Sequence, residues 1–563
     1  MRSNVLAAML TFAAPALCQT FFPPAPTPTA NPLTTQKALL GFVLFHEEQM
    51  SSDNTVACRS CHHFTSAGTD SRAHQTNAGY DGVYGTADDV IGSPGVAKRD
   101  ASGRYVLRDE GFAAQVTPRK APSMINVAYQ TRLFYDGRAR DGDFRDPLTG
   151  VVVATGPTAL ENLVLGPPLN PVEMGHPGRT WADVASKIAA ATPLRLADQI
   201  PARIATFING ASYPQLFQRA FGTPDVTPVR IAFAIASYVR TLISDQSRFD
   251  FAVGSNMPLT ALEAQGRALF ETRPSGPTFG TAPCTQCHGD ISATSHQTGP
   301  GAQNTTMYGQ TPTGNFHNTG VRPTWEDPGE GGISTTPSEV GRFKVPLLRN
   351  IALHSTFMHT GRMQSLADVV EFYSRGGDYH TNQAQEIQPR NLTSGEKAAL
   401  VAFLNALTDP RVAAQVEPFD TVRLGSERGA SRPTTFGDAS NGNGAHIPVM
   451  VAQEPVFVGT PRATIGVHHV APNTFVGLFV DPVGIPGGID LLDVRLYVGS
   501  AETQLAALGI SQSSASGTGY LSVSFSVPNA PQLSGLVLTT QWLAMDNTAT
   551  SGLTASAAAE IRL

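Results

Sequence analysis

Apolar residues recur every three or four positions in two stretches of the chain, which is the spacing of one face of an α-helix. The first stretch contains Ile231, Ile235, Tyr238, Val239 and Leu242, and the second contains Leu400, Phe403, Leu404 and Leu407. Threonine and glutamate three positions apart, a pair typical of a first helical turn, occur at Thr260–Glu263 and Thr393–Glu396. Long stretches rich in glycine and proline separate these segments. The pattern predicts a mainly α fold in which long loops surround a few helices.

The pattern changes to a period of two after about residue 420. Apolar and polar residues alternate at 493–498 and 521–527, with proline and glycine turns between such runs. Glycine, serine and asparagine dominate residues 425–444, as in a linker. We therefore predict a linker at residues 419–445 and an all-β sandwich domain of unknown role at residues 446–563.

Two segments of the helical part repeat each other. Pro32-Leu33-Thr34 and Pro258-Leu259-Thr260 each precede a Cys-x-x-Cys-His motif by the same distance, and similar apolar runs follow each of them. The repeat predicts two copies of one unit. We assign them to an N-terminal domain at residues 33–250 and a C-terminal domain at residues 251–418.

The beginning of the chain has the pattern of a secretory signal peptide, which we assign to residues 1–19. An apolar stretch, Val5–Ala14, follows a basic start and is too short to cross a bilayer. No later run of about 18 apolar residues occurs, so we expect no transmembrane segment and a periplasmic or secreted protein. A lipid anchor on Cys18 is the less favoured alternative because Leu17 is bulky. Residues 20–32 read as a proline-rich tether.

Composition narrows the function classes. The 563 residues carry a formal net charge of −6, and 41% of them are hydrophobic. The length predicts several domains, and the composition is that of a globular protein. Since no basic run of five residues occurs, we expect no nucleic-acid partner.

The chain has five cysteines, and four of them lie in two motifs. These motifs are Cys58-Cys61-His62 and Cys284-Cys287-His288, each spaced as Cys-x-x-Cys-His. In this motif two thiols bond to the vinyl groups of a haem while the histidine binds its iron. Two disulfides are the alternative in an exported chain, but they leave both histidines unexplained. The motifs predict two covalently bound c-type haems.

Five other segments carry recognisable signatures: Phe134–Arg138, Gly166–Met174, Ser247–Asp250, Phe343–Asn350 and Phe357–Met363. With the two haem motifs, they make residues 33 to about 410 resemble the bacterial di-haem cytochrome c peroxidases and their relatives, which include the di-haem enzyme that matures methylamine dehydrogenase. The resemblance implies a peroxidatic first haem and an electron-transfer second haem.

The resemblance also implies roles for single residues. Glu173 would lie on the open side of the first haem, where O–O cleavage needs a group that accepts and returns a proton. Pro167 would line the same cavity. Met363 would be the sixth ligand of the second haem, with His359 as the rival ligand, and Tyr135 would lie between the haems.

Several positions depart from the pattern of the family. Phe112 stands near the place of a histidine that caps the first haem in many relatives, and His74 is the only nearby substitute. Lys120 replaces a calcium-binding asparagine, which argues against calcium between the haems. Leu163 replaces a glutamine of the distal pocket.

We therefore expect an enzyme that reduces hydrogen peroxide to water with electrons from a small periplasmic cytochrome c or cupredoxin. One alternative is a relative that uses a ferryl state to oxidise a protein or an organic substrate. The other is a non-catalytic electron-transfer cytochrome with both irons six-coordinate. A homodimer is an open alternative to a monomer.

Overall fold

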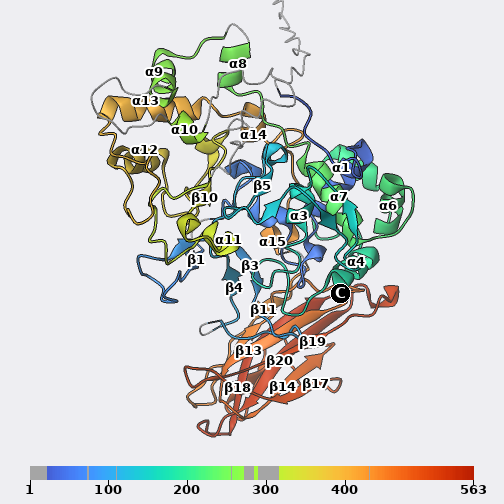
Figure 1. The fold of residues 1–563 in the computed structure, drawn as a ribbon. Helices are drawn as coiled ribbons and strands as arrows, with labels where there is room; N and C mark the ends of the chain where they lie inside the picture. Colours follow the sequence, from blue (N-terminus) through green and yellow to red (C-terminus); the bar gives the residue numbers. More distant parts are fainter. Residues whose placement is uncertain are drawn as a thin grey trace, which may run out of the picture.

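The computed structural model describes residues 22–72, 75–108, 111–254, 257–271, 284–288, 316–429 and 431–563. A helical part is followed by a strand-rich C-terminal part (Figure 1). None of the helices in these ranges combines the length and the hydropathy that a bilayer-spanning segment needs. The predicted signal peptide and His74 lie outside the described residues.

The first unit is built on two crossing helices, α1 (Thr35–Phe45) and α7 (Pro228–Val239). They approach so closely that a Cβ at Gly41 would lie 1.9 Å from the carbonyl oxygen of Ala234. The apolar face predicted on α7 is buried in this crossing. Four further helices complete the unit: α3 (Ala159–Val164), α4 (Trp181–Ala190), α5 (Ala202–Ile208) and α6 (Tyr213–Phe221).

The second unit repeats this crossing with α9 (Ala261–Glu271) and α13 (Ser394–Asn405), and α12 (Leu366–Arg375) packs against α13. A Cβ at Gly266 would lie 1.9 Å from the carbonyl oxygen of Ala399. The two glycines of the sequence repeat therefore have the same role: because they lack a side chain, each allows the backbone of a second helix to approach closely. The predicted cap forms, since the side chain of Thr393 accepts from the amide of Glu396.

The loops contain short helices and two-stranded ribbons. The helices are α2 (Cys58–Cys61), α8 (Arg248–Gly254), α10 (Thr285–His288), α11 (Gly331–Ser334), α14 (Pro410–Ala413) and α15 (Gly425–Arg428). The ribbons pair β1 (Thr76–Asn77) with β2 (Val90–Ile91), β3 (Pro94–Ala97) with β4 (Ala114–Val116), β5 (Arg132–Leu133) with β6 (Ala139–Arg140), β7 (Phe144–Arg145) with β8 (Val152–Ala154), and β9 (Phe316–His317) with β10 (Phe343–Lys344).

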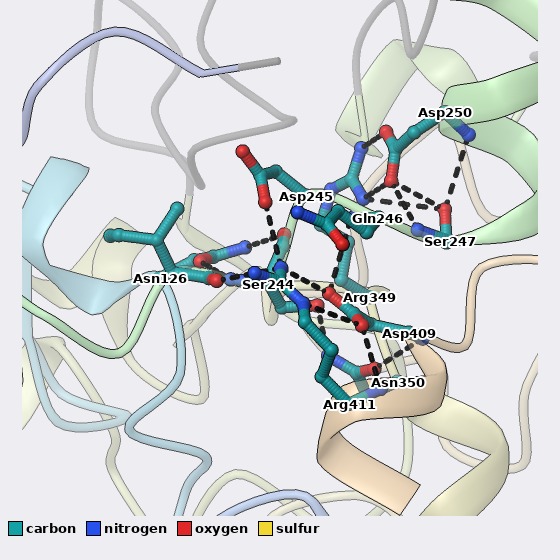
Figure 2. A network of polar contacts seen from close by, with 11 residues as sticks. Asn126, Ser244, Asp245, Gln246, Ser247, Asp250, Arg349, Asn350, Asp409 and Arg411 are labelled. Atoms are coloured by element: carbon teal, nitrogen blue, oxygen red, sulfur yellow. Dashed lines mark hydrogen bonds and ion pairs between the residues drawn. The ribbon is translucent and has the colours of Figure 1, made fainter. Parts of the chain in front are cut away.

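The segment 244–250 joins the two haem-binding units through buried polar side chains (Figure 2). The guanidinium of Arg349 donates to both carboxylate oxygens of Asp250, at 2.7 and 2.5 Å. Arg411 forms an ion pair with Asp245 at 2.7 Å. Arg349 and Asp250 come from two of the segments that carry the family resemblance, so these segments meet in space.

The C-terminal part is an antiparallel sandwich of two sheets. One sheet has the order β11-β21-β20-β14-β17 and the other β12-β13-β19-β18. Trp542 is fully buried in the core between the sheets. The strands are β11 (Thr434–Phe436), β12 (Val449–Val451), β13 (Ala463–Val470), β14 (Phe475–Asp481), β17 (Gln504–Ile510), β18 (Gln512–Ser513), β19 (Gly519–Phe525), β20 (Val537–Met545) and β21 (Leu553–Arg562), and β15 (Ile489–Leu491) pairs with β16 (Val494–Leu496).

Part of the predicted linker belongs to folded structure instead. Strand β11 lies inside residues 419–445 and pairs with β21. Upstream, the carboxylate of Glu48 accepts hydrogen bonds from the amides of Gly425 and Ser426, at 2.7 and 2.8 Å. Small polar residues suit tight turns as well as flexible linkers, so composition alone does not separate the two.

Candidate active site

The first Cys-x-x-Cys-His motif forms a helical turn at the wall of a cavity. Cys58 and Cys61 lie on α2, and His62 follows at its end. The imidazole Nδ1 of His62 lies 2.8 Å from the carbonyl oxygen of Gly68. Because a carbonyl only accepts, Nδ1 carries the proton there, and Nε2 is left as the metal-binding nitrogen. This is the arrangement that a proximal haem ligand requires.

The cavity beside this motif has a volume of about 570 Å³, within the range of cofactor sites. Cys58, Cys61 and His62 line it together with the predicted distal residues Glu173 and Pro167. All four cysteines of the two motifs are free thiols, so no disulfide joins them. The donor set and the cavity therefore fit a covalently attached haem.

Glu173 lies in the wall of the cavity, on the loop of residues 165–180 between α3 and α4, which we call the Glu173 loop. Its carboxylate accepts a hydrogen bond from the Asn170 side chain at 3.1 Å. Burial raises the pKa of Glu173, and the positive charge of Arg138 opposes this shift only in part. A carboxyl group with a raised pKa can both take and give a proton nearer to neutral pH, as peroxide cleavage requires. Leu163 lines the same cavity.

The second motif lines a separate cavity of about 170 Å³. Cys284, Cys287 and His288 belong to its wall, and His288 is hydrogen-bonded to the backbone of Pro346. The second histidine is thus oriented by a backbone carbonyl, as His62 is in the first unit.

The predicted bond between Met363 and the second haem stays a prediction. Met363 is absent from the described lining; it packs into the apolar cluster under α12, and its carbonyl accepts from the amide of Phe357 at 2.8 Å. His359 and Tyr373 both line this cavity. Tyr373 follows Val369 by one helical turn on α12, and both face the cavity. Helical spacing from the buried positions of α12 is the sequence signal that could have found Tyr373.

Tyr135 lies between the two cavities and lines both. Its ring meets that of His359 edge to face, with centroids 6.3 Å apart. Its carbonyl accepts from the amide of Lys344 at 2.7 Å, and Lys344 also lines both cavities. The predicted position of Tyr135 between the haem sites therefore agrees with the lining of the two cavities.

Lys120 reaches across the domain boundary. Its buried ammonium group donates to the carbonyl of Thr356, and it lies 3.4 Å from Nδ1 of His354. Burial lowers the pKa of Lys120 to about 7. The Lys120 side chain thus contacts a backbone oxygen of the second unit.

Phe112 does not line the first cavity. Its ring stacks on Tyr105, with centroids 5.2 Å apart, and it meets His468 of the sandwich edge to face. The position that the resemblance associates with haem capping is therefore used here to hold the C-terminal part.

Comparisons with known proteins find a matching family model and several similar proteins. Residues 35–257 match the family model described as di-haem cytochrome c peroxidase. The methylamine utilization protein MauG of Methylorubrum extorquens is 26% identical over 388 residues, which cover 68% of this chain and 81% of that protein. The cytochrome c551 peroxidase of Nitrosomonas europaea is 26% identical over 392 residues, 69% of this chain and 84% of that protein.

A solved structure, the diheme peroxidase BthA from Burkholderia thailandensis, aligns with a TM-score of 0.47 at 21% identity, covering 70% of this chain and 91% of that one. The sequence matches confirm the predictions of a peroxidase-type enzyme and of two c-type haems. The match of residues 35–257 and the two cavities, each lined by a Cys-x-x-Cys-His motif, make this chain similar to the di-haem cytochrome c peroxidases.

Proposed function

We propose that the protein reduces hydrogen peroxide to water in the first cavity, with electrons that a small periplasmic cytochrome c or cupredoxin delivers to the second haem. The observation that carries this proposal is that Glu173 and Pro167 share one cavity with Cys58, Cys61 and His62. A carboxyl group is thus available beside the place where peroxide would bind.

The chain's own residues handle the protons. The reaction consumes one peroxide, two electrons and two protons and yields two waters. Glu173 takes the proton from the peroxide oxygen nearer the iron and returns it to the departing oxygen, which leaves as water. The haem, when bound, supplies the iron that exchanges electrons with peroxide. Tyr135 lies on the path between the two cavities, where electrons would cross.

A turnover assay separates the three candidate functions. We expect peroxide to oxidise a reduced small cytochrome c in the presence of the holoenzyme, with two cytochromes oxidised per peroxide. Oxidation of an added phenol with no oxidation of the cytochrome would favour the substrate oxidase. Optical spectra without a high-spin band in any redox state would favour the electron-transfer cytochrome.

We propose Tyr373, in place of Met363, as the side chain that closes the distal side of the second haem. Replacing Tyr373 with phenylalanine should shift the midpoint potential of the second haem by on the order of 100 mV, since axial ligands spread haem potentials over about 0.8 V. Met363→Leu is the matched control and should leave the potential nearly unchanged. A spectroelectrochemical titration measures both, and a large shift in Met363→Leu alone would restore the original prediction.

We further propose that activity does not depend on calcium. The buried Lys120 side chain already donates to the Thr356 carbonyl, and its nitrogen does not supply the oxygen ligand that Ca²⁺ prefers. Treatment with EGTA is therefore expected to leave peroxide turnover unchanged. Loss of turnover that added Ca²⁺ restores would contradict this expectation.

A further inference from the structure

The β3–β4 ribbon lies between the helical part and the β-sandwich (Figure 1). On the side of the loop, the amide of Val96 donates to the carbonyl of Glu173 at 3.1 Å. A Cβ at Gly95 would lie 1.9 Å from the carbonyl oxygen of Val172. The Gln115 side chain donates to the carbonyl of Pro171 at 2.7 Å. The ribbon thus supports the backbone of the loop from which the Glu173 side chain extends.

The segment between β3 and β4 packs on the β12-β13-β19-β18 sheet of the sandwich. The rings of Tyr105 and Phe112 cover Gly466 of β13, where a Cβ would lie 2.8 Å from a ring carbon of Phe112 and 3.1 Å from one of Tyr105. Ser522 of β19 donates to the carbonyl of Tyr105 at 3.3 Å. The glycine therefore sets how closely the ribbon approaches the sandwich.

A buried ion pair fixes the same contact. Arg99 follows β3 and pairs with Glu454 of the sandwich, and both side chains are 1% exposed. Arg99 also donates to the hydroxyl of Thr464 on β13 at 3.0 Å and lies 3.6 Å from Asp53. Next to Asp53, the amide of Ser52 donates to the carbonyl of Met174, the residue after Glu173, at 2.8 Å. The sandwich is thus connected to the Glu173 loop by two routes.

We propose that the C-terminal β-sandwich acts as a brace that sets the position of the Glu173 carboxylate, with Gly466 and Glu454 as positioning residues. This inference rests on the proposed function, because it assumes that Glu173 handles the protons of peroxide. It also gives a role to the domain that lies outside residues 35–257, the part that matches the family. The position of a catalytic group relative to the reacting atoms must be fixed, since a shift of about 1 Å can lower a rate by as much as about 10²-fold.

The test compares two glycines of the sandwich in the haem-loaded, full-length protein. Gly466→Ala pushes on Phe112, whereas the nearest neighbours of a Cβ at Gly477 belong to its own sheet: Leu505 at 3.0 Å, Phe479 at 3.1 Å and the carbonyl of Ala507 at 3.7 Å. We expect the second-order rate constant for reaction with hydrogen peroxide to fall about tenfold in Gly466→Ala and less than about twofold in Gly477→Ala. The rate at which reduced cytochrome c reduces the second haem should stay the same in both.

A double-mutant cycle with Glu173→Gln separates positioning from general damage. In the Glu173→Gln background, Gly466→Ala should have no further effect on the peroxide rate. Adding Phe112→Leu, which replaces the facing ring with a smaller side chain, should return the peroxide rate of the Gly466→Ala protein to that of the unsubstituted protein. This rescue is a response that a merely destabilised fold would not give.

The outcomes are distinct for the two proposals. If Glu173→Gln alone leaves the peroxide rate unchanged, the proposed role of Glu173 fails. If Glu173→Gln lowers the rate but Gly466→Ala and Gly477→Ala behave alike, the brace fails while the proposed function stands. A Gly466→Ala effect that persists in full without the Glu173 carboxylate also overturns the brace. Should Gly466→Ala fail to fold, Glu454→Gln takes its place in the comparison with Gly477→Ala and in the Glu173→Gln background, where the same results support or overturn the brace; the Phe112→Leu rescue applies to Gly466→Ala alone.

Discussion

Replacing Glu173 with glutamine is expected to lower the rate of peroxide turnover by about 10²- to 10⁴-fold, the usual contribution of a positioned acid–base group. Glutamine keeps the size of the side chain and can keep the contact with Asn170, but it cannot accept and return a proton. Haem attachment and the reduction of the second haem should be unaffected. Stopped-flow absorbance after mixing with peroxide measures the loss directly.

Glu326→Gln is the matched control for this substitution. Glu326 lines the same cavity, but its carboxylate already accepts from Arg322 at 2.6 Å. We expect less than about threefold loss of turnover there, since this ion pair takes no part in the proton transfer. Equal losses in the two variants would mean that charge in the cavity, and not the proton transfer at Glu173, limits the reaction.

The pH dependence gives a second check on Glu173. Accepting the proton of peroxide requires the ionised carboxylate, so the rate should fall as the pH falls through the pKa of Glu173. Burial holds that pKa above its ordinary value of 4.5. The acidic limb of the profile should therefore lie at higher pH than for an exposed glutamate, and it should vanish in Glu173→Gln. A limb that persists in the variant would belong to another group.

Local patterns predicted the repeated core well. The equivalence of Gly41 and Gly266 follows from the repeat, and both glycines admit a crossing helix in the structure. The cap at Thr393 also follows from the sequence, because its two partners are three residues apart. In each case the partners of an interaction are near in sequence or are copied from one unit to the other.

The features that were missed depend on contacts between distant segments. Phe112 has its place because it packs on Gly466, more than three hundred positions away, and no periodicity reports such a contact. Helical spacing places Tyr373 on the buried face of α12, but the cavity that this face lines depends on how α12 packs on α13. The folded part of the predicted linker likewise depends on the pairing of β11 with β21.

The same long-range contacts lead to the largest expected effect on stability. Arg99→Met should lower the free energy of unfolding by about 3–5 kcal/mol, the usual cost of removing one partner of a buried ion pair. Both Arg99 and Glu454 are 1% exposed, so water cannot replace the lost guanidinium. Unfolding in guanidinium chloride, followed by circular dichroism and by tryptophan fluorescence, to which the buried Trp542 contributes, measures the change.

Arg423→Met is the control, because Arg423 pairs with Asp198 in a position where the two side chains are 47% and 35% exposed. Its loss should cost no more than about 1 kcal/mol. The loss of unfolding free energy in Arg99→Met, relative to the unsubstituted protein, should also become smaller as the pH falls toward 4.5, the ordinary pKa of a glutamate. Burial raises the pKa of Glu454, so without Arg99 the folded state binds a proton that the unfolded state releases, and its stability grows as the pH falls. Equal costs in the two arginine variants would show that the sandwich is held by its apolar contacts alone, and that Glu454 adds nothing to the support of the Glu173 loop.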